Sequence, residues 1–118
     1  MNTKLISPKN HAIMDYLLVG SLLIVPALLK FNKKARNIYA AEALALLPYV
    51  ALTKQPLAAK GLIPFKTHGK IDSVNVGMFA LKTLFKPFHK SKKVMLYNIA
   101  FTTISGLSVL LTDWKSSK

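Results

Sequence analysis

The sequence predicts an all-α fold: an integral membrane four-helix bundle made of two parallel, tandem helical-hairpin repeats. Three observations predict it, namely four largely apolar stretches of helical length, basic clusters between them, and one motif that occurs twice. The 118 residues carry a net charge of +13, yet 52% are hydrophobic and the mean hydropathy is +0.34. That is too apolar for a soluble basic domain of this size. The length allows one domain, and the lack of cysteine excludes disulfides and thiolate metal sites.

The first two apolar stretches are residues 16–29, which carry no charge, and residues 37–53, in which Glu42 is the only charge. Each contains one proline, Pro26 or Pro48, and we expect a kink at each, because neighbouring membrane helices can satisfy the carbonyl that proline frees. A cleaved signal peptide is a poor alternative for the first stretch. No small-x-small cleavage site follows it, and a basic cluster follows instead.

The third stretch, residues 71–88, is the weakest candidate span because Asp72, Asn75, Lys82 and Lys86 lie among its apolar residues. Alone it is typical of an amphipathic helix, and in the bundle we expect Lys82 to place its ammonium at the membrane interface. The fourth stretch, residues 94–112, is uncharged and close to the roughly 20 residues that cross a bilayer core. Spans one and three reach that length only if they begin near His11 and His68.

The main alternative is a soluble four-helix bundle with very basic loops. Its helices would carry a polar face at every turn, whereas residues 17–29 and 94–111 are apolar or small nearly all round. Four membrane-spanning helices therefore fit better. The positive-inside rule leaves their orientation nearly tied, with eight basic residues on the side of both termini and nine on the other. The denser short loops favour termini outside.

An internal repeat aligns residues 6–20 with residues 63–77 at a single offset. The matched positions are Ile6/Ile63, Lys9/Lys66, His11/His68, Asp15/Asp72, Val19/Val76 and Gly20/Gly77, with a looser continuation through Phe31/Phe88, Tyr39/Tyr97 and Thr53/Thr112. We therefore predict a single membrane domain, residues 1–118, with repeat one at 6–54 and repeat two at 63–113. An even number of crossings per repeat makes the repeats parallel, so both histidines lie at one depth, on the side of both termini.

These residues carry a resemblance to a family. The spacing H-x-x-x-D-x-x-x-x-G at the start of each hairpin, the pair His68-Gly69, and the closing residues 111–114 resemble small bacterial membrane proteins of the SPW-repeat type. The resemblance implies two similar hairpins and no established biochemical role. The Ser-Pro-Trp tripeptide of that family is absent here, and Lys54 replaces the aspartate expected after the first closing threonine.

The candidate functional or packing cluster comprises His11, Asp15, His68 and Asp72. A histidine and an aspartate four residues apart share one helix face. We expect N-caps at the preceding Asn10 and Thr67, which would place each carboxylate about one turn into its helix, near the positive end of the dipole.

Three roles for this cluster stay open. The aspartates could accept hydrogen bonds from their own histidines or from the other hairpin and fix the packing. The four groups could bind a first-row divalent metal, with bis-histidine haem ligation less favoured. They could also relay protons, since ionisable groups within a membrane are functional candidates. The sequence alone assigns no metal ligand and no cofactor.

Other residues have simpler expected roles. We expect Glu42 either to pair with a lysine or tyrosine in the bundle or to lie near the membrane interface and extend toward it, and His89 to be a solvated loop residue. Helix packing accounts for three glycines, Gly20, Gly77 and Gly106. Attraction to anionic lipid head groups accounts for the basic loops, whose residues are Lys30, Lys33, Lys34, Arg36, Lys86, Lys90, Lys92 and Lys93.

No motif supports enzyme chemistry, since the sequence has no phosphate-binding loop, activated serine motif or H-E-x-x-H. Nucleic acid is a poor partner because the lysines lie at helix ends and no aromatic residues interleave with them. We predict a multi-pass protein of the cell (inner) membrane, a non-catalytic subunit or scaffold that forms a homo-oligomer or joins a larger complex. The alternative is a transporter or a proton- or ion-conducting oligomer that uses the paired His/Asp motifs.

Overall fold

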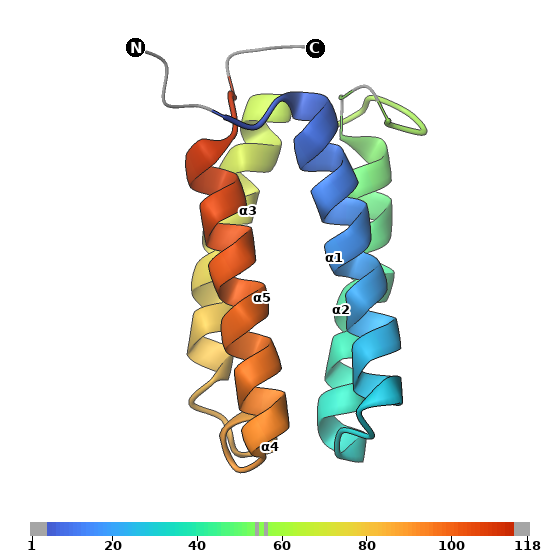
Figure 1. Ribbon diagram of the computed structural model, residues 1–118. Helices are drawn as coiled ribbons and strands as arrows, with labels where there is room; N and C mark the ends of the chain where they lie inside the picture. The colour runs from blue at the N-terminus through green and yellow to red at the C-terminus, as the bar shows by residue number, and fades with distance from the viewer. Residues whose placement is uncertain (1–4, 54, 56, 115–118) are drawn as a thin grey trace.

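The computed structural model describes residues 5–53, 55 and 57–114. The side chain of His89 is not among the described parts, so the prediction that it is solvated lies outside them. Helix α1 is Pro8–Leu28, α2 is Lys33–Leu52, α3 is Phe65–Lys82, the short α4 is Lys86–His89 and α5 is Lys92–Leu111. Helices α1 and α2 pack as one hairpin and α3 and α5 as the other (Figure 1). The prediction of an all-α bundle with four main helices in two hairpins is confirmed.

The two hairpins are joined crosswise at one end of the bundle, where residues 5–7, 57–64 and 112–114 lie (Figure 1). Ile6 forms a parallel bridge with Thr112, and Thr53 forms one with Ile63. The amide of Ile6 donates to the Leu111 carbonyl at 2.9 Å. The residue that leads into each hairpin therefore pairs with the residue that follows the other hairpin.

The starts of α1 and α3 correct the predicted N-caps. Ser7 caps α1, its hydroxyl accepting from the Asn10 amide at 3.2 Å with Pro8 in the first turn, and Pro64 precedes α3. Asn10 and Thr67 therefore lie inside the first turns. Counted from Pro8 and Phe65, each histidine is the fourth helical residue and each aspartate the eighth. The helix dipole acts mainly within the first turn, so it does not explain the aspartates.

The end of α1 is set by a left-handed residue. Lys30 has φ 54°, the one positive φ among described non-glycine residues. Its amide donates to the Ala27 carbonyl at 3.3 Å, and the Phe31 amide donates to the Pro26 carbonyl at 3.0 Å. These two bonds form a Schellman motif. Pro26 and Pro48 both lie inside continuous helices, so neither proline ends a helix.

The third predicted span is displaced along the chain, and the surroundings of Lys82 differ from those predicted. Helix α3 begins and ends six residues before the predicted range 71–88. Lys82 is 7% exposed and forms an ion pair with Glu42, its ammonium lying 3.3 Å from the centre of the Phe79 ring. The expected extension of Lys82 to the membrane interface is therefore wrong. The expectation that Glu42 pairs with a lysine or tyrosine is confirmed.

Aromatic side chains fill the interior near this ion pair. Tyr39 and Tyr97, which occupy matched positions in the two repeats, meet edge to face at 5.3 Å, and Phe79 stacks on Phe101 at 4.5 Å. The Tyr39 hydroxyl donates to the buried Asn98 amide oxygen at 2.7 Å. The interior of the bundle away from the crosswise bridges is consequently a packed aromatic core.

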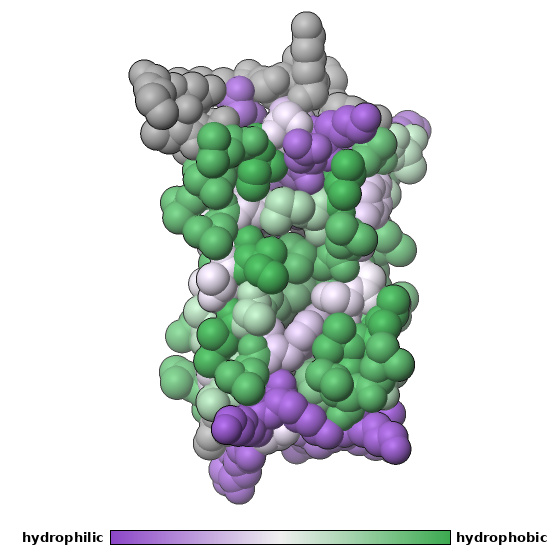
Figure 2. Space-filling view, in the orientation of Figure 1, coloured by the Kyte–Doolittle hydropathy of each residue, from purple (hydrophilic) through white to green (hydrophobic). Residues whose placement is uncertain are grey.

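The outer surface of the four long helices is hydrophobic. Figure 2 shows a broad hydrophobic band between two ends where hydrophilic residues gather. Within the described residues, α1 and α5 are long and apolar enough to cross a membrane. Core helices of soluble proteins also pass that test, but they are mostly buried, whereas only 28% and 22% of the apolar windows of α1 and α5 are buried.

Candidate functional site: a symmetric histidine–aspartate cluster

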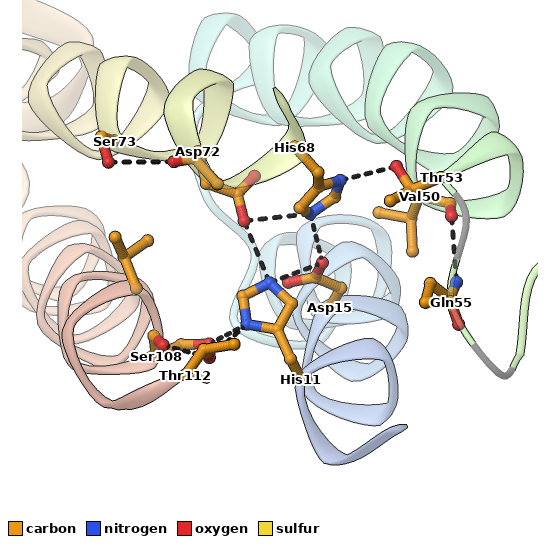
Figure 3. Close-up of polar contacts among 12 residues, drawn as sticks. His11, Asp15, Val50, Thr53, Gln55, His68, Asp72, Ser73, Ser108 and Thr112 are labelled. Carbon is orange, nitrogen blue, oxygen red and sulfur yellow. Dashed lines mark hydrogen bonds and ion pairs between the residues drawn. The ribbon is translucent and has the colours of Figure 1, made fainter. Parts of the chain in front are cut away.

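All four residues of the predicted cluster meet at the end of the bundle that holds the crosswise bridges (Figure 3). His11 and Asp15 come from α1, and His68 and Asp72 from α3. Both histidines are 1% exposed, and the aspartate side chains are 14% and 15% exposed. Two elements that are far apart in sequence thus place two imidazoles and two carboxylates in one nearly buried site.

The four groups form a closed ring in which nitrogen and oxygen alternate. His11 Nε2 lies 3.1 Å from Asp15 Oδ2 and 3.0 Å from Asp72 Oδ2. His68 Nε2 lies 2.9 Å from Asp15 Oδ2 and 3.0 Å from Asp72 Oδ2. Each imidazole therefore contacts the carboxylate one turn along its own helix and the carboxylate of the other hairpin.

The second ring nitrogen of each imidazole, Nδ1, contacts the threonine that directly follows the other hairpin. His11 Nδ1 lies 2.7 Å from Thr112 Oγ1, and His68 Nδ1 lies 2.6 Å from Thr53 Oγ1. Sequence reasoning paired these two threonines as matched closing positions without giving them a role. Their recurrence in both repeats was the signal that could have assigned them to the cluster.

One position breaks the symmetry. The Tyr49 hydroxyl lies 2.9 Å from Asp72 Oδ1 and 2.8 Å from the His68 carbonyl, and its ring stacks on His68 at 4.3 Å. Ser108, which stands four residues before Thr112 as Tyr49 stands before Thr53, places its hydroxyl 2.9 Å from His11 Nδ1. Neither residue was singled out from the sequence, because nothing local to it indicates a contact with the cluster.

Two large rings cover the cluster at the end of the bundle. The Trp114 ring lies 4.8 Å from His11 and 4.7 Å from Phe65, and the Trp114 indole donates to the Val109 carbonyl at 2.9 Å. A Cβ added at Gly69 would lie 2.8 Å from Trp114 Cδ2. The glycine beside His68 therefore allows the tryptophan to close over the site.

A cavity of about 50 Å³ adjoins the cluster on its inner side. Asp15 and Asp72 line it with a few other polar side chains such as Asn75 and Ser108, and the rest of its lining is mainly aliphatic and aromatic. A volume of roughly 10–15 Å³ accommodates one water molecule, so the cavity has room for several. The carboxylates of the cluster thus face a small space within the bundle.

The other predicted residues fall into two groups. Gly106 lies in the α3–α5 contact, where an added Cβ would stand 3.6 Å from Val76. Around Gly20 and Gly77, by contrast, no described atom outside their own helices lies within 4 Å of an added Cβ. Gly20 is half-buried and Gly77 is exposed, and the packing role predicted for them stays a prediction. The residues predicted to contact lipid head groups are all exposed and lie at or near the opposite end of the bundle, namely Lys30, Lys33, Lys34, Arg36, Lys86, Lys90, Lys92 and Lys93.

Comparison with known proteins adds no assignment: no family model, no curated protein and no solved structure matches this chain.

Proposed function

We propose that this chain is a multi-pass membrane protein of the cell (inner) membrane that serves as a non-catalytic subunit or scaffold. The observation that carries the proposal is the set of exposed large hydrophobic residues on all four long helices, which form a band between two hydrophilic ends on the face shown in Figure 2. Exposed large hydrophobic residues occur on each of them, for example Leu17 at 69%, Leu44 at 72%, Val74 at 65% and Leu110 at 66%. Soluble monomers rarely expose contiguous apolar patches of this kind.

The dimensions of the bundle support the same conclusion. Its longest extent is 41 Å, against about 40–45 Å for a bilayer with its head groups. The 20 residues of α5 correspond to a helix of about 30 Å, the thickness of the hydrocarbon core. The basic residues at the end opposite the cluster suit contact with anionic head groups.

The ion pair between Glu42 and Lys82 supports crossings by α2 and α3 as well. Charged side chains in a membrane are costly unless they pair inside the bundle. Glu42 and Lys82 belong to different hairpins and pair with each other, with the Lys82 side chain 8% exposed and the Glu42 side chain 27% exposed. In a four-span topology each of these charges therefore has an opposite charge beside it within the bundle.

A scaffold role is favoured over conduction by the contacts of the cluster. Its ring joins the two hairpins through reciprocal bonds, His11 to Asp72 and His68 to Asp15. The cavity beside the carboxylates gives some support to proton or ion passage. However, the stacked rings of Phe79 and Phe101 line that cavity, and the packed aromatic core lies beyond them. The resemblance to SPW-repeat membrane proteins stays a prediction.

Membrane fractionation tests this proposal. The chain should sediment with membranes, resist extraction by alkaline carbonate, and require detergent for solubility. A folded, monodisperse protein in the detergent-free supernatant after ultracentrifugation would contradict the membrane assignment. Its mass in detergent then tests assembly, since a scaffold that assembles with itself should run as an oligomer.

Liposome flux separates the scaffold from the conductor. Purified protein in liposomes should give no proton flux above that of empty liposomes, and His11→Ala and Asp72→Asn should change assembly or melting only. Flux that these substitutions abolish while the helical content survives would establish conduction.

A further inference from the structure

The hydrogen bonds around the cluster determine which imidazole nitrogen carries a proton. Thr53 Oγ1 lies 2.8 Å from the Tyr49 carbonyl and 2.6 Å from His68 Nδ1. A threonine hydroxyl has one proton, and a carbonyl can only accept. The Tyr49 carbonyl lies in the last turn of α2, where carbonyls lack helical donors, so we assign the threonine proton to it. His68 Nδ1 must then donate to Thr53 Oγ1.

The same assignment holds in the other hairpin. Thr112 Oγ1 donates to the Ser108 carbonyl and also contacts His11 Nδ1. The Ser108 hydroxyl also lies 2.9 Å from His11 Nδ1 and can accept from it, so we assign a proton to His11 Nδ1 as well. With Nδ1 protonated on both imidazoles, the other two imidazole nitrogens, the Nε2 atoms, face the two Oδ2 atoms of the aspartates.

The inner ring needs two positive charges. Without them, the lone pairs of both Nε2 atoms would point at carboxylate oxygens 2.9–3.1 Å away. Two protons, one on each Nε2, would satisfy the ring. One divalent cation bound by all four atoms would satisfy it equally, since the four possible ligand atoms lie within 4.8 Å of one another.

We propose that the cluster is a binding site for a first-row divalent metal cation of the zinc type, with His11 Nε2, His68 Nε2, Asp15 Oδ2 and Asp72 Oδ2 as its ligands. Imidazole and carboxylate are the nitrogen and oxygen donors that such cations prefer. The inference goes beyond the scaffold function and does not depend on the membrane, because it rests on contacts inside the bundle.

The nitrogen–oxygen distances in the ring are close to those of a tetrahedral zinc site. Zinc bonds of about 2.0–2.1 Å place tetrahedral ligand atoms about 3.3 Å apart. The four nitrogen–oxygen distances in the ring are shorter by only a few tenths of an ångström. Small rotations of the carboxylates would provide the remaining space.

The surroundings supply what a metal site needs beyond its ligands. Metal-bound histidines almost always donate their other nitrogen to an oxygen that fixes the tautomer, and Thr53 and Thr112 provide these oxygens. Trp114 and Phe65 cover the outer side of the histidines. Asp15 and Asp72 also line the adjoining cavity, so the carboxylates have space beside them in which to adjust to a cation.

Zinc titration of the whole chain in detergent tests the proposal. Chelator-treated protein is given ZnCl₂, separated from excess metal by gel filtration, and analysed for zinc by elemental analysis. We expect one zinc per chain and a higher melting temperature. Magnesium should do neither, because it prefers octahedral oxygen ligands. A folded wild-type chain that retains no stoichiometric zinc would overturn the proposal, whatever any variant does.

Substitutions locate the metal. Asp15→Asn and Asp72→Asn remove one ligand charge each and should weaken zinc binding by more than roughly 100-fold. Loss of a residue that only hydrogen-bonds to a metal ligand already weakens metal binding by up to about that factor. Thr53→Val and Thr112→Val should weaken it by roughly 10–100-fold. Thr103→Val is the matched control on α5, because Thr103 makes the same bond to a carbonyl four residues back, away from the cluster.

Two further readouts complete the test. Cobalt in place of zinc should give the visible absorption of a tetrahedral site in the wild type and in Thr103→Val, and not in Asp15→Asn. Circular dichroism checks that each variant is helical. If an asparagine variant fails to fold, the threonine variants decide. Equal zinc binding by wild type, Asp72→Asn and Thr53→Val would place the metal elsewhere and refute the site.

Discussion

Gly69 is a position beside the cluster at which there is no room for a side chain. It follows His68 directly, and the ring of Trp114 occupies the place of its missing side chain. Trp114 in turn covers His11. The glycine therefore acts on the cluster through the tryptophan, and the pair explains why the sequence places Gly after the second histidine and Trp near its end.

We expect Gly69→Ala to lower the thermal stability of the protein in detergent. An added Cβ would stand 2.8 Å from Trp114 Cδ2, and overpacking of this kind destabilises by about 1–3 kcal/mol. The gain in helix propensity offsets at most about 1 kcal/mol of that. Thermal unfolding followed by circular dichroism measures the change.

Gly77→Ala is the matched control on the same helix. No described atom outside the helix lies within 4 Å of its added Cβ, so only the gain in helix propensity applies and the melting temperature should not fall. Equal melting temperatures for the two variants would show that Trp114 does not pack as described.

At the scale of the helices, the sequence predicted the elements and their pairing better than their ends. The apolar stretches and the offset between His11 and His68 predicted four helices, two hairpins and the meeting of both histidines at one end. The ends were displaced because they depend on contacts distant in sequence. Local rules favoured Asn10 as a cap, whereas Ser7 holds that place and the preceding Ile6 pairs with Thr112.

The sequence predicted only those residues of the cluster that recur in both repeats as His and Asp. The recurrence of His and Asp identified four of its residues, but Tyr49 reaches Asp72 from another helix, and the matching position of the second repeat holds a different residue, Ser108. The role of Lys82 was missed for a similar reason, since its partner Glu42 is 40 residues away. Pairings of this kind follow from how the hairpins pack, which periodicity alone does not determine.

Substitution of Lys30 by glycine should stabilise the turn between α1 and α2. Lys30 holds the left-handed position of the Schellman motif, a conformation that disfavours side-chain-bearing residues by about 1–2 kcal/mol and that glycine adopts readily. We expect Lys30→Gly to raise the free energy of unfolding by about 1 kcal/mol, measured by thermal or denaturant unfolding in detergent.

Lys33→Gly supplies the comparison. Lys33 is the first residue of α2 and is equally exposed and basic, so it matches the change in charge without the left-handed backbone. That variant should be neutral or less stable, because glycine is a poor helix former. A loss of stability in Lys30→Gly would contradict the role given to the turn.

For the whole molecule, the decisive property is the solvent that surrounds the helices. Leu44 is 72% exposed in the middle of α2, and Leu62 is 61% exposed in the connection before α3. In water, an aspartate at either position would change stability by no more than about 0.5 kcal/mol. In lipid, a charge at the centre of a helix costs about 2.5–3.5 kcal/mol.

Leu44→Asp should therefore reduce the amount of protein in the membrane fraction and its melting temperature, while Leu62→Asp should leave both near the wild-type values. Quantitative immunoblotting of membrane fractions and thermal unfolding provide the measurements. If both variants behave like the wild type, the band around the helices does not face lipid.

The crosswise bridges have a consequence for how two copies of the chain could combine. Each hairpin gives the other one histidine, one aspartate and two bridging residues, and receives the same in return. A hairpin from a second molecule would offer the same partners in the same places. Exchange of hairpins between two molecules would thus produce an intertwined dimer without losing one of these contacts, and the connection after α2 would decide which form is populated at a given concentration.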